Sequence, residues 1–166
     1  MSSALSGYVF CAKKNLDYGQ KLVADLTEEQ MTLQPAPSGE APANHPAWVL
    51  SHLNVYMPIL SLALDGKLFD DPKEHEFGMK SKPSDDASIY ASKDKLIGDY
   101  VTSHEKVISQ LEAADASVLE TPIQLERWQS FMPTVGFIVP YLLCNHENIH
   151  LGQISAWRRI QGLPSV

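Results

Sequence analysis

A histidine pair in the last part of the chain has the spacing of a metal site. Residues 144–153, CNHENIHLGQ, contain His146, Glu147 and His150 in the order H-E-x-x-H. On a helix the two imidazoles lie one turn apart on one face, where both can bind the same ion. In zinc proteases the glutamate of this pattern is the general base. The pattern therefore leaves two alternatives, a protease site or a metal site of another kind.

The protease alternative lacks a third ligand downstream of the pair. The longer pattern H-E-x-x-H-x-x-G-x-x-H would need glycine and histidine where this chain has Gln153 and Ala156. No acidic residue follows Glu147, so a later glutamate ligand is also missing. We therefore expect a metal site of another kind, with its third ligand upstream.

His52 is the upstream histidine with the most suitable surroundings. Trp48 lies four residues before it and Tyr56 four after it, so the three side chains share one apolar helix face. A histidine on a face that points to the core needs a hydrogen-bond partner or a metal for its ring nitrogens. Together with His146 and His150 it makes three inward-facing histidines, which suit a divalent ion with an open coordination position. Satisfied core histidines remain the alternative.

The other three histidines have simpler interpretations. His75 lies in a charged loop, where we expect it to be exposed, and His45 precedes Pro46 at a helix entrance, where we expect a structural role. His104 lies in the polar stretch TSHEKV, so we expect it on the surface.

The two cysteines, Cys11 and Cys144, do not make a disulfide framework. We expect both to be small buried hydrophobic residues. Cys144 lies two residues before His146, so on a helix it points away from the metal face.

Four segments have helical periodicity, and no segment shows sustained strand alternation. We expect helices over about 6–26, 46–65, 88 or 92–111, and 134–162. Asn44 is a candidate N-cap for the second helix, Pro58 predicts a kink in it, and Pro140 predicts a bend in the last one. The connections 27–45, 66–87 and 112–133 are long, which predicts an all-α four-helix bundle with crossover connections, formed by residues 1–166 as one domain.

Composition narrows the classes of partner. The chain has 20 acidic and 13 basic residues and a net charge of −7, which argues against a nucleic-acid-binding surface. No apolar run approaches the roughly 20 residues that span a bilayer, and we recognise no signal peptide. We expect a cytoplasmic protein with a small-molecule substrate and no contact with nucleic acid or membrane.

Three stretches of the sequence resemble the DinB-like superfamily of four-helix metal proteins, whose members include bacillithiol and mycothiol transferases and a thiol-dependent isomerase. The stretches are HPAWVLSHLNVY, HENIHLGQISAWRRIQGL and LTEEQMTLQPAP, and the likeness covers nearly the whole chain. The resemblance implies a four-helix bundle with long crossovers, often a homodimer. It also implies a divalent ion, zinc or nickel, held by three histidines that fall on His52, His146 and His150.

Three functions remain open. The first is a metal-dependent transferase in which a low-molecular-weight thiol, as co-substrate, attacks a small electrophile. The second is a metal-dependent hydrolase of a small molecule, with Glu147 as a candidate acid or base, although on an ideal helix it lies about 100° from His146. The third is a non-catalytic metal-binding bundle of a stress response. Gln153, one turn after His150, is a second candidate for a catalytic role.

Overall fold

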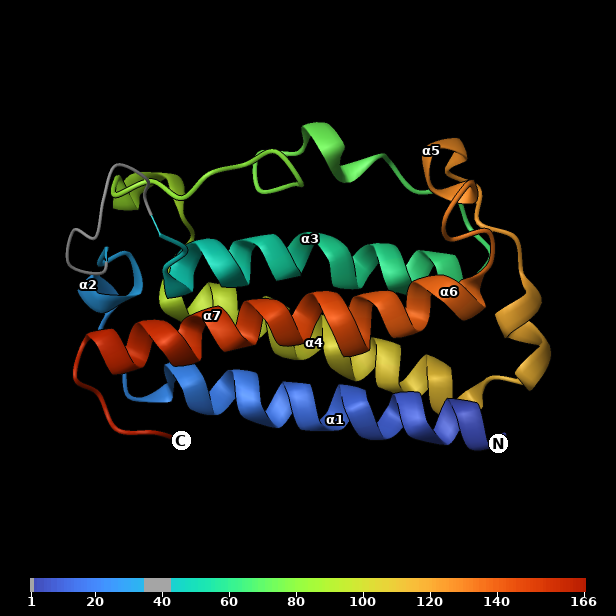
Figure 1. The fold of residues 1–166 in the computed structure, drawn as a ribbon, viewed down its shortest axis with the longest axis horizontal. Helices are drawn as coiled ribbons and strands as arrows, with labels where there is room; N and C mark the ends of the chain where they lie inside the picture. The colour runs from blue at the N-terminus through green and yellow to red at the C-terminus, as the bar shows by residue number, and fades with distance from the viewer. Residues whose placement is uncertain (1, 35–42) are drawn as a thin grey trace.

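Four long helices form a bundle in the computed structural model, which describes residues 2–34 and 43–166 (Figure 1). They are α1 (Ser3–Ala24), α3 (Pro46–Leu64), α4 (Lys93–Ala113) and a last helix made of three consecutive parts. These parts are α6 (Val135–Pro140), the π-helical segment η4 (Tyr141–His146) and α7 (Glu147–Ile160). Within the described residues the only β pairing is an isolated bridge between Pro122 and Thr134. The predicted all-α bundle is confirmed.

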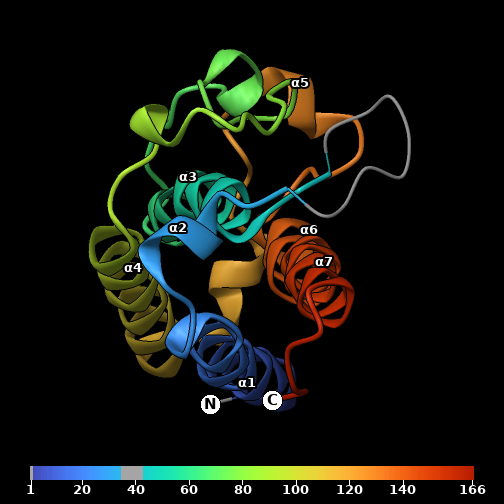
Figure 2. The ribbon, with the colours of Figure 1, turned by 90° about the vertical axis from the view of Figure 1, so that its left-hand side faces the viewer.

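The bundle needs a crossover because two neighbouring helices run in the same direction. Seen from its end, the bundle has the order α1, α4, α3 and the last helix (Figure 2). α3 and α4 run parallel, and α1 and the last helix run the opposite way (Figure 1). Residues 65–92, which include the short helices η1 (Pro72–Glu74) and η2 (Ala87–Ile89), therefore return along the length of α3. This is the predicted kind of crossover connection.

The other connections also contain short helices. α2 (Glu28–Met31) follows α1, and a capping box with Thr27 and Gln30 begins it. η3 (Ala116–Glu120) and α5 (Glu126–Gln129) lie between α4 and the last helix. Residues 35–42 of the connection predicted over 27–45 lie outside the described residues.

The helix ends follow local signals, with one correction. The N-cap of α3 is His45 and not Asn44: the His45 Nδ1 accepts a hydrogen bond from the Trp48 backbone N–H at 3.3 Å. The Asn44 side chain instead donates to Gln153 on α7. Pro58 leaves α3 uninterrupted and lies on its exposed side. Gly162, with a φ of 72°, ends the last helix as predicted.

α3 has more buried residues than any other long helix of the bundle. By length and composition it could cross a membrane, with a mean hydropathy of 1.4, which corrects the expectation that no apolar segment would be long enough. Its most apolar window is 78% buried inside the bundle, however, as in a core helix. Leu50, Leu53 and Leu60 are fully buried. The apolar sequence of α3 is thus explained by its neighbours, α4 and the last helix, which pack against it.

Candidate metal centre

The structure brings His52, His146 and His150 together. His52 lies in the middle of α3, and the pair lies where η4 meets α7, the part of the last helix that packs on α3. One ring nitrogen of each histidine lies within 4.8 Å of those of the other two. His52 is 4% exposed and His150 is 9% exposed. Two helices that are far apart in the sequence thus hold three imidazoles close enough to bind one ion.

Hydrogen bonds orient two of the rings. The Nδ1–H of His52 donates to the carbonyl oxygen of Phe77 at 2.7 Å, and the Nδ1–H of His150 donates to the Gln153 Oε1 at 2.8 Å. Both bonds leave the Nε2 lone pair free for the cluster. Histidine ligands of metals characteristically use their second nitrogen in this way.

His146 is the one ring of the cluster whose Nδ1 no hydrogen bond orients within the described residues. Its Nε2 lies 3.0 Å from the His52 Nε2, and its buried Nδ1 has no hydrogen-bond partner among the described residues. Two imidazole nitrogens on a tetrahedral zinc ion lie about 3.4 Å apart, given Zn–N distances of about 2.0–2.1 Å. A small outward movement of the His146 ring would accommodate such an ion. The three residues therefore fit a divalent metal.

The cluster favours neutral histidines. Burial, together with the smaller effect of the neighbouring imidazoles, lowers the pKa of His52 to about 4 and that of His146 to about 3. Burial also lowers the pKa of His150, although its hydrogen bond with Gln153 opposes the shift. At neutral pH the rings therefore carry lone pairs and no charge, the form that binds metals.

A local irregularity of the last helix places the pair. Pro140 has no backbone N–H, and the helix widens into the π-helical segment immediately after it. His146 is the last residue of this segment and His150 lies one α-helical turn later, so both face α3. The disturbance predicted at Pro140 is thus a π segment that carries a residue of the cluster. Such segments are frequent at functional sites.

A cavity of about 260 Å³ opens onto the cluster. Its walls come from α3, from the crossover 65–92, from the connection before the last helix and from the last helix itself. Besides the three histidines, the lining residues are Trp48, Tyr56, Met79, Arg127, Trp128, Phe131, Met132 and Tyr141. The lining is largely aromatic and apolar, with one cationic side chain and no carboxylate. It is shaped for a small molecule with an apolar part.

Glu147, the general-base candidate, lies on the other side of the helix. Its carboxylate is fully buried and accepts hydrogen bonds from the Tyr100 hydroxyl at 2.6 Å and the Asn15 amide at 2.9 Å. The His104 Nε2 lies 2.6 Å from it as well. Burial and the Glu147 carboxylate raise the pKa of Tyr100, so its hydroxyl remains a donor. Glu147 joins α7 to α1 and α4 and does not line the cavity.

The structure also shows the surroundings of Gln153 and of the three histidines outside the cluster. Gln153 does not line the cavity; its Oε1 accepts from both His150 and Asn44, so it supports a ring of the cluster. The expectation that His104 is exposed is wrong: it is fully buried because Glu147, 43 residues away, supplies its partner. No local pattern in TSHEKV could have shown this. His45 has the expected structural role and His75 is exposed.

The cysteines differ from the expectation of two buried hydrophobic residues. Cys144 is exposed and Cys11 is half-buried, and both are free thiols. The Cys11 thiol contacts the carbonyl oxygen of Leu143 at 3.5 Å. Burial, with the neighbouring Cys144, raises the pKa of Cys11 to about 12. Neither sulfur belongs to the histidine cluster.

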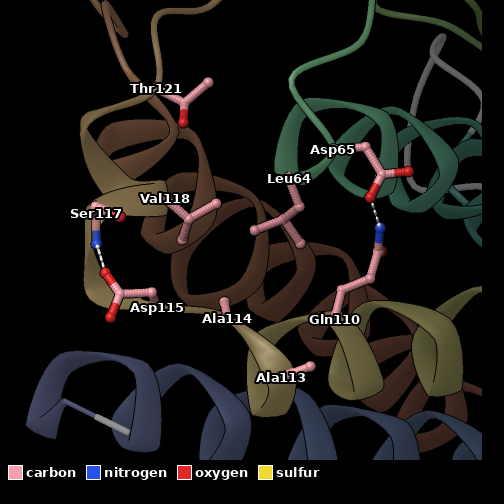
Figure 3. A pocket seen from close by; sticks show the side chains of 9 residues that line it. All are labelled: Leu64, Asp65, Gln110, Ala113, Ala114, Asp115, Ser117, Val118 and Thr121. Carbon is pink, nitrogen blue, oxygen red and sulfur yellow. Dashed lines mark hydrogen bonds between the residues drawn. The ribbon is translucent and has the colours of Figure 1, made fainter.

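A second cavity, of about 460 Å³, lies between the end of α3, the end of α4 and η3 (Figure 3). Gln110 donates to Asp65 across it at 2.7 Å, and Asp115 accepts from the backbone of Ser117 at its edge (Figure 3). Its lining contains no histidine or cysteine. It has none of the groups that make the first cavity chemically distinctive.

Comparisons with known proteins agree with this picture. The family model of the DinB superfamily matches residues 13–154. The crystal structure of a conserved protein from Enterococcus faecalis has the same fold, with a TM-score of 0.72 and 17% sequence identity over 96% of this chain and 97% of that one. The comparison with curated proteins found no match.

Proposed function

The chain belongs to the DinB superfamily and its three-histidine cluster fits a metal-binding protein, and from this premise we propose that it is a divalent-metal-dependent S-transferase. The metal would be zinc or nickel, both of which accept imidazole ligands. The reaction forms a C–S bond between a low-molecular-weight thiol and a small electrophile, breaks the bond to a leaving group such as halide, and releases the thiol proton to solvent. The observation that carries the proposal is the convergence of three neutral imidazoles on a cavity without a carboxylate.

Each part of the site has a task in this reaction. When bound, the ion would lower the pKa of a thiol and so supply a thiolate nucleophile at neutral pH. His52, His146 and His150 offer the lone pairs that would hold it, and the Phe77 carbonyl and Gln153 orient two of these rings. The aromatic and methionine side chains of the cavity bind the electrophile and exclude the water that would compete with the thiol.

The lining also explains why we prefer a transferase to a hydrolase. A hydrolase that activates water needs a base or acid close to the ion. Glu147, the candidate for that role, is committed to Tyr100, Asn15 and His104 inside the bundle. A thiol activated by the metal itself needs no such group. The cavity at the cluster likewise favours catalysis over mere storage of the ion.

The test uses untagged protein loaded with zinc or nickel and a panel of low-molecular-weight thiols with an aromatic halide as electrophile. We expect conjugation above the uncatalysed rate with at least one thiol, its loss in His150→Ala, and its retention in Asn145→Ala. Asn145 is an exposed residue of the same helix. A metal-loaded protein that conjugates no thiol would reject the proposal, as would full conjugation by metal-free His150→Ala. Hydrolysis of small esters in the same preparations would favour the hydrolase instead.

A further inference from the structure

Among the described residues that line the cavity, Arg127 on α5 has the only charged side chain. Its Nε donates to the Asp71 Oδ2 at 2.7 Å and its Nη2 donates to the Asp71 Oδ1 at 2.5 Å. This bidentate ion pair joins α5 to the crossover and fixes the plane of the guanidinium. Within the described residues Nη1 has no hydrogen-bond partner, so one donor edge of the group remains available.

Tyr56 supplies a second donor in the same cavity. It lies one turn after His52 on α3, and its ring centroid is 4.8 Å from that of His52 and 4.6 Å from that of His146. Tyr56 and Arg127 line the same cavity, so its hydroxyl and the guanidinium offer hydrogen-bond donors to one small ligand.

Resting on the proposed function, we propose that the electrophile carries a carboxylate on an aromatic or apolar body, and that Arg127 and Tyr56 bind this carboxylate. A planar guanidinium edge matches a carboxylate, and the walls formed by Trp128, Phe131 and Met132 match the apolar body.

The charges of the site favour one negative group on the electrophile. The Arg127–Asp71 pair has no net charge, and no other described residue that lines the cavity carries a formal charge. A divalent ion thus leaves two positive charges, of which a thiolate neutralises one and a carboxylate the other. A dianionic phosphate would leave an uncompensated negative charge in a mostly apolar cavity, which is unfavourable.

Binding without turnover is the first arm of the test. Zinc-loaded protein is titrated with benzoate and with benzamide by calorimetry, and the Arg127→Gln variant separates binding by the guanidinium from binding by the ion. We expect benzoate to bind about tenfold or more tightly than benzamide, as for a charge-assisted hydrogen bond, and Arg127→Gln to abolish the difference. Asp71→Asn removes the competing carboxylate and should tighten benzoate binding, which keeps the test decisive if Arg127→Gln does not fold. Equal binding of the two ligands by the wild type, or unchanged benzoate binding in Asp71→Asn, would overturn the inference.

Turnover is the second arm. The metal-loaded protein is assayed with 4-chloro-3-nitrobenzoate and its carboxamide, each corrected for its uncatalysed rate. The carboxylate should have a KM about tenfold lower or more, with a similar kcat, and Arg127→Gln should remove the KM difference. Conjugation of both compounds without preference overturns the carboxylate subsite alone. Conjugation of neither, with benzoate still preferred in the first arm, overturns the transferase and supports the subsite.

Discussion

The three histidines of the cluster differ in the hydrogen bonding of their Nδ1 atoms. His52 and His150 use theirs for hydrogen bonds with Phe77 and Gln153, and only His146 has a buried nitrogen without a partner among the described residues. The rotation of two rings is therefore fixed before any ion arrives, whereas the third can adjust. Ligands oriented in this way bind metals more tightly than free ones.

Gln153→Leu tests this orientation. The variant removes the acceptor for the His150 Nδ1–H while keeping a side chain of similar size. We expect zinc affinity to fall about 10- to 100-fold, the usual effect of losing such a partner, with little change in the fold. Titration against a competing chelator measures it, and Asn145→Ala serves as the control. An affinity equal to that of the wild type would mean that Gln153 does not support the site.

The Glu147→Gln variant distinguishes a structural role of Glu147 from a catalytic one. The amide keeps the size of the side chain. It places an N–H donor, however, against one of the three buried groups that now bind the carboxylate, those of Asn15, Tyr100 and His104. We expect the free energy of unfolding to fall by about 1–3 kcal/mol, with metal binding retained. Denaturant unfolding and metal analysis check the two parts. A variant of full stability that has lost only its turnover would instead make Glu147 catalytic.

At the scale of the elements, close packing of α1, α4 and α7 helps to set the position of α7. Tyr100 on α4 reaches Glu147 on α7 by lying over Gly19 of α1, where an added Cβ would come within 2.5 Å of the tyrosine hydroxyl oxygen. A glycine at this point of α1 is needed for the buried network to form.

Gly19→Ala should therefore destabilise the bundle although alanine favours helices. We expect a loss of about 1–3 kcal/mol from overpacking, measured by denaturant unfolding. Gly7→Ala is the matched control, since it lies in the same helix with nothing within 4 Å of the added Cβ, and should be neutral or stabilising by up to about 1 kcal/mol. Equal effects of the two substitutions would show that Tyr100 does not depend on the space at Gly19.

The ion pair between Arg127 on α5 and Asp71 in the crossover should make the free energy of unfolding depend on pH in the acid range. Arg127 holds the pKa of Asp71 at about 2, below the value of about 3.9 expected in the unfolded chain. The pair therefore stabilises the fold fully above pH 4 and loses this contribution as the pH falls from about 4 to 2. Both side chains are about a third exposed, so we expect about 1 kcal/mol or less. Comparing the wild type with Asp71→Asn by urea unfolding from pH 6 to 2.5 measures it, and parallel pH profiles would contradict it.

For the whole molecule, local signals in the sequence were enough to predict the four helices and their crossovers. Pro46 and Gly162 mark helix ends that the structure confirms, and Trp48 and Tyr56 mark the apolar face that carries His52. Spacing also indicated correctly that the histidine pair would face a neighbouring helix. These features depend on residues within a turn or two of one another.

The features missed depend on contacts between distant residues. Nothing near His104 shows that Glu147 will bury it, and nothing near Arg127 shows that Asp71 will hold it at the cavity. His45, and not Asn44, is the N-cap of α3, and the Asn44 side chain instead donates a hydrogen bond to Gln153 on another helix. Three-dimensional packing decides such pairings, and local patterns in the sequence do not show which distant residues will meet.

The measurement that tests the central claim most directly is the metal content of untagged protein after dialysis against zinc or nickel, determined by mass spectrometry. We predict about one ion per chain in the wild type and in Asn145→Ala, and none in His52→Ala, His146→Ala or His150→Ala. A wild type without metal, or histidine variants that keep a full equivalent, would contradict a metal centre formed by these three residues.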